Sequence, residues 1–220
     1  MIKAVIFDLD GTLLDTREDL SKAINLTLKD FNKKELTNEE IIKNVGNGIK
    51  NLVFNCVKPS DDQEEKVLVT FNKHYHEHFL ENTRPYNGVE ELVNKLIKDN
   101  IYVGVNSNKD DFYSKELIKK HFNNIKLDYV LGYEPGIERK PSGQGALQLL
   151  KNMDVDSSEA IYVGDSGVDI KTAANARIQS ISCLWGFRTK EELLSAGSTI
   201  LVEKPEEIYK YIKEKNHDWI

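Results

Sequence analysis

Short apolar runs rich in β-branched residues recur along the chain, and each ends at a polar or glycine-containing segment. The first run, Ala4 to Phe7, is apolar at every position, which is typical of a strand buried on both faces of a parallel sheet. Similar runs follow at residues 101–105, 129–131, 160–163, 179–184 and 199–202. From residue 89 onward, amphipathic segments separate these runs. This alternation predicts an α/β fold with a parallel sheet covered by helices.

A series of helical patterns stands between the first and second of these apolar runs. Leu20, Ile24, Leu28 and Phe31 share one helical face, and three further segments with such spacing follow before residue 80. Capping-box sequences precede three of the four segments: Thr16–Asp19, Thr37–Glu40 and Ser60–Gln63. We therefore predict an α/β core of residues 1–14 and 83–220, with a helical cap subdomain at 15–82 inserted after the first strand.

Length and charge set limits on the kind of protein. The chain has 220 residues, a formal net charge of -6 and a pI near 5.5. It has no basic stripe and no apolar run long enough to span a bilayer, so we expect no nucleic-acid or membrane partner. The first strand follows the N-terminus without a signal-peptide pattern, and Cys56 and Cys183 read as reduced core residues. We expect a cytoplasmic monomer or homodimer.

Polar side chains follow the carboxyl ends of the predicted strands. They are Asp8 with Asp10, Ser107, Lys140, and Asp165 with Asp169. Because the carboxyl ends of parallel strands meet at one edge of a sheet, we expect these groups to converge there. Carboxylates in such a cluster repel one another unless a cation is present, and hard oxygen ligands without His or thiolate favour Mg²⁺.

These residue types suit phosphoryl transfer from a small phosphorylated metabolite. Mg²⁺ would offset the charge of a phosphate ester, and a carboxylate can attack phosphorus to form an aspartyl-phosphate. A second carboxyl can protonate the leaving oxygen and then deprotonate the attacking water. A serine hydroxyl, a lysine and loop amides can stabilise the charge on the equatorial oxygens. Taken one at a time, Ser107 could merely cap a helix and Lys140 could be a surface residue.

Four segments together resemble the four motifs of the haloacid dehalogenase (HAD) superfamily. In order they are Asp8-Leu-Asp10-Gly11-Thr12, Asn106-Ser107-Asn108-Lys109, Arg139-Lys140-Pro141 and Gly164-Asp165-Ser-Gly-Val-Asp169. The resemblance covers nearly the whole chain and implies a Rossmann-like core with a small four-helix cap. The loops Val45-Gly-Asn-Gly48 and Trp185-Gly-Phe-Arg188 resemble the phosphoglycolate phosphatase-like branch. This resemblance implies a Mg²⁺-dependent phosphatase, with phosphoglycolate as the leading named substrate.

The resemblance also implies a role for each matching residue. Asp8 resembles the nucleophile and Asp10 the general acid and base, while Ser107 and Lys140 resemble the pair that binds the phosphoryl group. Asp165 resembles the carboxylate that binds Mg²⁺ directly, joined by Asp8 and the backbone carbonyl of Asp10. Asp169 resembles an acid of the second shell or one bridged to the metal by water. The amides of Leu9, Asp10 and Asn108 would hold phosphate oxygens.

Asp10 helps to sort the reaction type. The dehalogenases of the superfamily lack an acid at this position, because they protonate no leaving oxygen, so Asp10 favours a phosphatase or a phosphomutase. A β-phosphoglucomutase-like phosphomutase is the first alternative, against which Thr12 counts, since such mutases often carry Val there. A non-catalytic module that binds a phosphorylated ligand is the second alternative. The presence of all the catalytic residue types argues against it.

Several other residues are weaker candidates. Arg17 and Arg188 could meet a substrate carboxylate, and Asn47 could contact substrate, but two exposed charges and an ordinary helix breaker explain them as well. His74, His76 and His78 form a cluster without an evident third ligand, which favours a structural or solvated role. Two positions depart from the family pattern. Gly143 replaces a proline of the lysine motif, and Arg177 stands where a glycine usually ends the helix, which requires a left-handed residue there.

Overall fold

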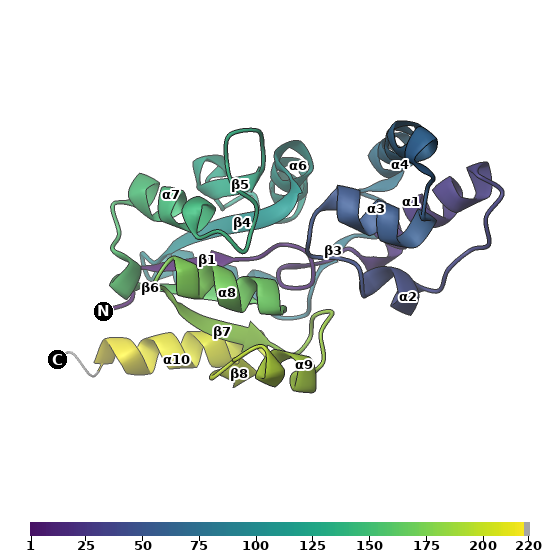
Figure 1. The fold of residues 1–220 in the computed structure, drawn as a ribbon. Helices are drawn as coiled ribbons and strands as arrows, with labels where there is room; N and C mark the ends of the chain where they lie inside the picture. The colour runs from purple at the N-terminus through teal and green to yellow at the C-terminus, as the bar shows by residue number, and fades with distance from the viewer. Residues whose placement is uncertain (218–220) are drawn as a thin grey trace.

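A six-stranded parallel sheet forms the centre of the computed structural model, which describes residues 1–217 (Figure 1). Its strands, in spatial order, are β5 (Val130–Tyr133), β4 (Tyr102–Asp110), β1 (Ala4–Phe7), β6 (Ala160–Gly164), β7 (Gln179–Cys183) and β8 (Leu201–Val202). Phe7 pairs with Val105 on one side and with Val163 on the other. The carboxyl ends of β4, β1 and β6 therefore lie side by side, as the apolar pattern predicts.

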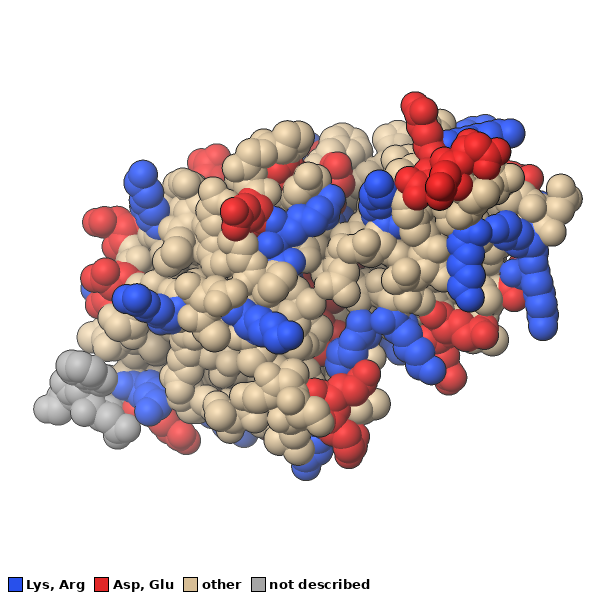
Figure 2. Space-filling model, viewed as in Figure 1, with Lys and Arg blue, Asp and Glu red and all other residues tan. Residues whose placement is uncertain are grey.

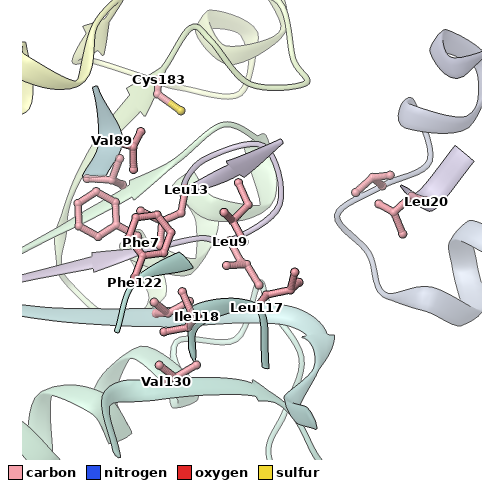
Figure 3. Packing of buried hydrophobic residues seen from close by; sticks show 14 of the residues in the cluster. Phe7, Leu9, Leu13, Leu20, Val89, Leu117, Ile118, Phe122, Val130 and Cys183 are labelled. Atoms are coloured by element: carbon pink, nitrogen blue, oxygen red, sulfur yellow. The ribbon is translucent and has the colours of Figure 1, made fainter. Parts of the chain in front are cut away.

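Helices cover both faces of this sheet. They are α5 (Val89–Lys98), α6 (Asp111–His121), α7 (Gln144–Met153), α8 (Gly167–Asn175) and α10 (Pro205–His217). A short helix α9 (Lys190–Ser195) and the 3₁₀ turns η2 (Leu127–Tyr129) and η3 (Ser157–Glu159) lie in the connections. Val5 and Phe7 point into the cluster built with α5, α6 and α10, whereas Ala4 and Ile6 face α7 and α8. Figure 3 shows Phe7 with Val89, Ile118 and Phe122 around it. The fold is thus the predicted α/β, Rossmann-like class.

Four further helices lie together beside the carboxyl ends of the strands, on the right of Figure 1. They are α1 (Arg17–Asp30), α2 (Asn38–Ile42), α3 (Ile49–Val57) and α4 (Glu64–His78), with a 3₁₀ turn η1 (Asp61–Gln63) before the last. A two-stranded antiparallel sheet of β2 (Leu14–Asp15) and β3 (Arg84–Pro85) joins the segments that enter and leave this group. We call α1 to α4 the cap helices. The limits 15–82 of a separate cap remain a prediction.

The starts of the cap helices differ in part from the capping-box prediction. Thr37 and Glu40 do form the reciprocal hydrogen bonds of a capping box. The box predicted at Thr16 is wrong, because the Asp19 carboxylate accepts hydrogen bonds from Asn82 and Thr83 instead. Ser60 also makes no side-chain cap bond. A fully buried Asp19 is better satisfied by several tertiary donors than by one local amide.

The second sheet strand is longer than the apolar run suggests. We predicted it at 101–105, but β4 continues to Asp110, and its pairing with β5 reaches Tyr133 after an irregular register between Asn106 and Asp110. The four residues of the second motif therefore belong to a strand rather than to a loop. All four are buried, so the strand holds Ser107 and its neighbours rigidly.

Both departures from the family pattern have local explanations. A Cβ atom on Gly143 would lie 2.7 Å from the backbone nitrogen of Ala176, so glycine lets the start of α7 approach the end of α8. Arg177 has a φ of 56°, the left-handed conformation that its position requires. Cys56 and Cys183 are free and buried, as predicted. Basic and acidic side chains are interspersed over the face drawn in Figure 2. No helix among residues 1–217 has the length and apolar character needed to cross a membrane.

Candidate active site

Three buried carboxylates meet at the carboxyl ends of β1 and β6. Asp8, Asp165 and Asp169 each offer a ligand atom, and these atoms lie within 4.8 Å of one another. Asp8 directly follows β1, and its backbone N–H donates to the carbonyl of Val163 at 2.9 Å, which extends the sheet ladder by one residue. The sequence-predicted convergence of these acids at one sheet edge is therefore present in the structure.

A single lysine lies between two of these acids. The Lys140 ammonium is 2.8 Å from Asp8 Oδ1 and 2.8 Å from Asp169 Oδ1, and its side chain is 3% exposed. Burial alone would lower the pKa of Lys140, but the charges of Asp169 and Asp8 outweigh it and raise that pKa well above its usual value. Burial, followed by the charge of Asp169, also raises the pKa of Asp8. The lysine remains charged and partly neutralises the cluster.

Asn108 fixes the backbone that carries this lysine. Its side-chain oxygen accepts from the Lys140 backbone N–H at 2.8 Å, and its amide nitrogen donates to the Lys140 carbonyl at 3.0 Å. The same amide nitrogen donates to the carbonyl of Gly46, in the loop between α2 and α3, at 2.9 Å. Asn108 thus joins β4, the lysine loop and the cap helices. The sequence suggested its backbone amide as a ligand but not this side-chain role.

The two acids after β6 have different surroundings. Asp165 Oδ2 accepts a hydrogen bond from the Phe187 backbone at 2.6 Å, and burial together with the Asp169 charge raises the pKa of Asp165 to about 7. Asp169 uses both oxygens within the protein, because Oδ1 faces Lys140 and Oδ2 accepts from the Ser166 backbone at 3.1 Å and its hydroxyl at 2.5 Å. Asp165 is therefore better placed to bind a metal directly, and Asp169 to support it.

The chemistry of this donor set fits Mg²⁺. Three buried carboxylates, of which only Asp8 and Asp169 contact Lys140, carry excess negative charge, and oxygen ligands suit a hard cation. Glycines leave room around Asp165. Gly11 has a φ of +86°, and a Cβ atom there would lie 2.4 Å from Asp165 Oδ2. A Cβ atom on Gly186 would lie 2.3 Å from Asp165 Cβ.

Asp10 has a partner that sequence reasoning missed. The ammonium of Lys109 lies 3.1 Å from Asp10 Oδ2, and the Lys109 side chain is 2% exposed. Ser107 Oγ accepts from the backbone N–H of Lys109 at 3.1 Å. The available signal was the position of a lysine inside an otherwise buried segment, immediately after two candidate phosphate ligands.

Asp8, Asp10, Ser107, Asn108, Lys109 and Lys140 line a cavity of about 30 Å³. Its other walls come from the cap helices and the loop between α2 and α3: Leu20, Val45, Gly46, Gly48, Ile49 and Leu52. The cap helices therefore form one side of the space next to Asp8 and Asp10.

The three weaker candidates do not line this cavity. Arg17 is bound to Asp15 through two contacts, at 2.8 and 2.6 Å. Arg188 donates to the carbonyls of Ile42, Lys43 and Val45, at 3.2, 3.3 and 2.6 Å, so it bridges the loop after β7 and the end of α2. Asn47 is exposed, although its neighbours Gly46 and Gly48 do line the cavity.

The histidine cluster also has local partners. His74 lies 2.7 Å from Asp30, and His78 lies 2.7 Å from Glu81. His76 packs near Phe79 and Phe112. Within the part of the chain that the structure describes, Asp8, Asp165 and Asp169 form the one group of three or more potential metal ligands. These contacts agree with a structural or solvated role for the histidines.

Comparison with known proteins finds one matching family and several similar proteins. The family model described as "Haloacid dehalogenase-like hydrolase" matches residues 5–183. A phosphoglycolate phosphatase of Neisseria gonorrhoeae is 30% identical over 228 residues, covering 99% of this chain and 96% of the relative. One from Aquifex aeolicus is 29% identical over 84% of this chain and 86% of its own length. A solved structure from Lactobacillus delbrueckii, provisionally named a phosphoglycolate phosphatase, matches with a TM-score of 0.89 and 29% identity, covering 96% of this chain and 98% of that one.

Proposed function

Because the chain belongs to the haloacid dehalogenase-like hydrolase family, we propose that it hydrolyses a small phosphomonoester with Mg²⁺ through a phosphorylated Asp8. The observation that carries this proposal is the buried Asp8 carboxylate beside Asp165, Asp169 and Lys140. Asp8 Oδ1 accepts from both Lys140 and the Leu9 backbone N–H, the latter at 2.7 Å. These two contacts orient the carboxylate while Oδ2 has no described hydrogen bond among residues 1–217.

The first half of the reaction transfers the phosphoryl group to the protein. A carboxylate oxygen of Asp8 forms a bond to phosphorus as the ester P–O bond breaks, and the leaving alkoxide takes a proton from the carboxyl of Asp10. In the second half, Asp10 removes a proton from water, whose oxygen attacks phosphorus. The bond between Asp8 and phosphorus then breaks, which regenerates the Asp8 carboxylate and releases inorganic phosphate.

Other groups of the cavity would bind the transferred phosphoryl group. Lys140 and Ser107 line the cavity next to Asp8, and the backbone amides of Asp10 and Asn108 are proposed additional donors. The Leu9 amide would join them only by turning from Asp8 Oδ1, to which it donates in this structure. Asp8, Asp165 and the Asp10 carbonyl would hold Mg²⁺, with Asp169 in support. When bound, Mg²⁺ supplies positive charge that offsets the phosphate oxygens and draws them toward the nucleophile.

The relatives suggest the first substrate to test. The proteins from N. gonorrhoeae and A. aeolicus are both named phosphoglycolate phosphatases, and each aligns with more than four fifths of this chain, at 99% and 84%. We therefore propose phosphoglycolate, a small phosphomonoester, as the leading substrate.

Phosphate release from a panel of substrates tests the proposal. The panel holds phosphoglycolate, pyrophosphate, nucleotides, hexose phosphates and p-nitrophenyl phosphate, each with Mg²⁺ or with EDTA. We expect turnover that requires Mg²⁺ and disappears in Asp8→Asn. A folded, Mg²⁺-binding protein that releases phosphate from no member would contradict the phosphatase. Consumption and regeneration of a sugar bisphosphate would instead identify a phosphomutase.

A further inference from the structure

Lys109 is a buried cation to which the proposed mechanism gives no task. It lies near the end of β4 and lines the same cavity as Asp8 and Asp10. Its side chain is 2% exposed, and its ammonium lies 3.1 Å from Asp10 Oδ2. Burying a charged lysine costs free energy even when it is paired, and costs more when it is not. A buried Lys109 cannot serve solubility as a surface lysine does, so its ion pair with Asp10 calls for another explanation.

The ammonium also contacts the cap. It lies 4.9 Å from the ring centroid of Tyr75 on α4, within the range of a cation–π interaction. Tyr75 is fully buried and packs edge-on against Tyr113 of α6, with ring centroids 5.0 Å apart. The ammonium of Lys109 therefore lies between the Asp10 carboxylate and the Tyr75 ring.

The two oxygens of Asp10 differ in their contacts. Oδ2 faces Lys109, whereas Oδ1 is buried and has no hydrogen-bond partner among residues 1–217. An unpaired buried acceptor costs free energy, and native proteins keep few of them. Asp10 lines the cavity, so a leaving-group oxygen or the attacking water would be the natural partner of Oδ1.

From this geometry we infer that Lys109 is a positioning residue, which anchors Asp10 Oδ2 so that Oδ1 is the atom that gives and takes the proton. Tyr75 completes the anchor by covering the ammonium, so the arrangement depends on a cap helix as well as on the sheet. The inference rests on the proposed function. In this inference, Oδ2 of Asp10 is held in place by Lys109, and Oδ1 of the same carboxyl transfers the proton.

The inference predicts an effect that depends on the leaving group. An alkyl phosphate needs a proton on its leaving oxygen, whereas p-nitrophenolate leaves readily without one. In Lys109→Met, we expect the single-turnover release of alcohol from glycerol phosphate to slow by about 100-fold, the lower part of the range for general acid catalysis. The rapid first release of p-nitrophenol from p-nitrophenyl phosphate should stay within about threefold of the parent.

Further variants separate positioning from general damage. Lys109→Gln keeps an N–H donor for Asp10 and should recover most of the rate with glycerol phosphate. Tyr75→Leu should cause a smaller loss with the same preference between substrates. Lys126→Met is the matched control, because Lys126 also covers a tyrosine ring, at 5.7 Å from Tyr129, but is exposed and does not line the cavity. It should behave as the parent with both substrates.

Two outcomes would overturn the inference. In Lys109→Met, the first release of alcohol and the first release of p-nitrophenol could slow equally, without recovery in Lys109→Gln. That result would show that Lys109 binds phosphate or supports the fold. Parent-like rates with both substrates would show that Lys109 does not position Asp10. Failure of the proposed function would give another result, because the parent protein itself would then release neither alcohol nor p-nitrophenol.

Discussion

The ammonium of Lys140 lies 2.8 Å from the carboxylate of Asp8, and both side chains are buried, at 3% and 8% exposure. The same ammonium serves Asp169 at 2.8 Å. One cation therefore holds two of the three acids in the buried cluster of Asp8, Asp165 and Asp169. Its removal should affect both stability and catalysis.

Lys140→Met should lower the free energy of unfolding of the metal-free protein by about 3 kcal/mol, since it leaves buried charges unpaired. It should also lower kcat by about 100-fold or more, because a donor to the phosphoryl oxygens is lost. Urea unfolding and steady-state kinetics measure the two effects. Lys140→Met combined with Asp169→Asn should regain part of the stability. If Lys140→Met alone were as stable as the parent, that result would contradict the assigned ion pairs.

Metal removal should make stability depend on pH through the buried acids. Burial and the Asp169 charge raise the pKa of Asp165 to about 7, above its unfolded value of about 4. Between these values the folded state binds more protons than the unfolded chain, so the free energy of unfolding falls as pH rises, by about 1 kcal/mol per pH unit. Below pH 4 this contribution to stability is complete.

Urea midpoints at pH 5 and pH 7.5 test this dependence. In EDTA the midpoint should fall with rising pH, and Mg²⁺ should reduce that fall because it favours the charged carboxylates. Asp165→Asn removes one titrating group and should flatten the EDTA series. The same pH dependence with EDTA and with Mg²⁺ would count against a metal site at these acids.

Arg188 links the core to the cap helices. Its guanidinium donates to the carbonyls of Ile42, Lys43 and Val45. Arg188→Met should weaken the attachment of the loop after α2 to the core by about 2 kcal/mol, the scale of hydrogen bonds to a charged group. Hydrogen–deuterium exchange of amides 45–52 should then speed up. Lys190→Met, at a neighbouring exposed position, provides the control. Unchanged exchange in Arg188→Met would refute the link.

Asp19 fastens the chain where it leaves the cap helices. Its carboxylate accepts from the Asn82 backbone and side chain and from the Thr83 backbone and hydroxyl, at distances of 2.8 to 3.1 Å. Asp19→Ala leaves these buried donors unpaired and should lower the free energy of unfolding by about 3 kcal/mol. Asp30→Ala, which breaks an exposed pair with His74, should cost less than about 1 kcal/mol. Chemical denaturation compares them, and similar losses would show that Asp19 has no special role.

The sequence predicts best where function depends on spacing along one segment. Asp8 and Asp10 follow a strand that is apolar throughout, and the alternating elements after residue 89 indicate the sheet that gathers Ser107, Lys140 and Asp165. The fold class was confirmed, because burial periodicity is a local property. The hydrophobic and polar pattern could not show whether a polar side chain makes a local hydrogen bond or one to a distant segment.

Asp19 shows this limit clearly. An acid three residues after Thr16 suits a capping box, but tertiary donors from Asn82 and Thr83 take both of its oxygens. Arg188 shows another limit, since its acceptors are backbone carbonyls, which every residue carries. The pairing of Lys109 with Asp10 depends on the register of β1 and β4, which no local pattern encodes.

The central claim is that the phosphoryl group passes through Asp8. We would mix the protein with Mg²⁺ and p-nitrophenyl phosphate, quench in acid within milliseconds, and map the added phosphoryl group by mass spectrometry. The account predicts up to one phosphoryl group per chain, located on Asp8, removed by hydroxylamine and absent from Asp8→Asn. Rapid phosphate release with no phosphorylated Asp8, or with the group on another residue, would contradict it.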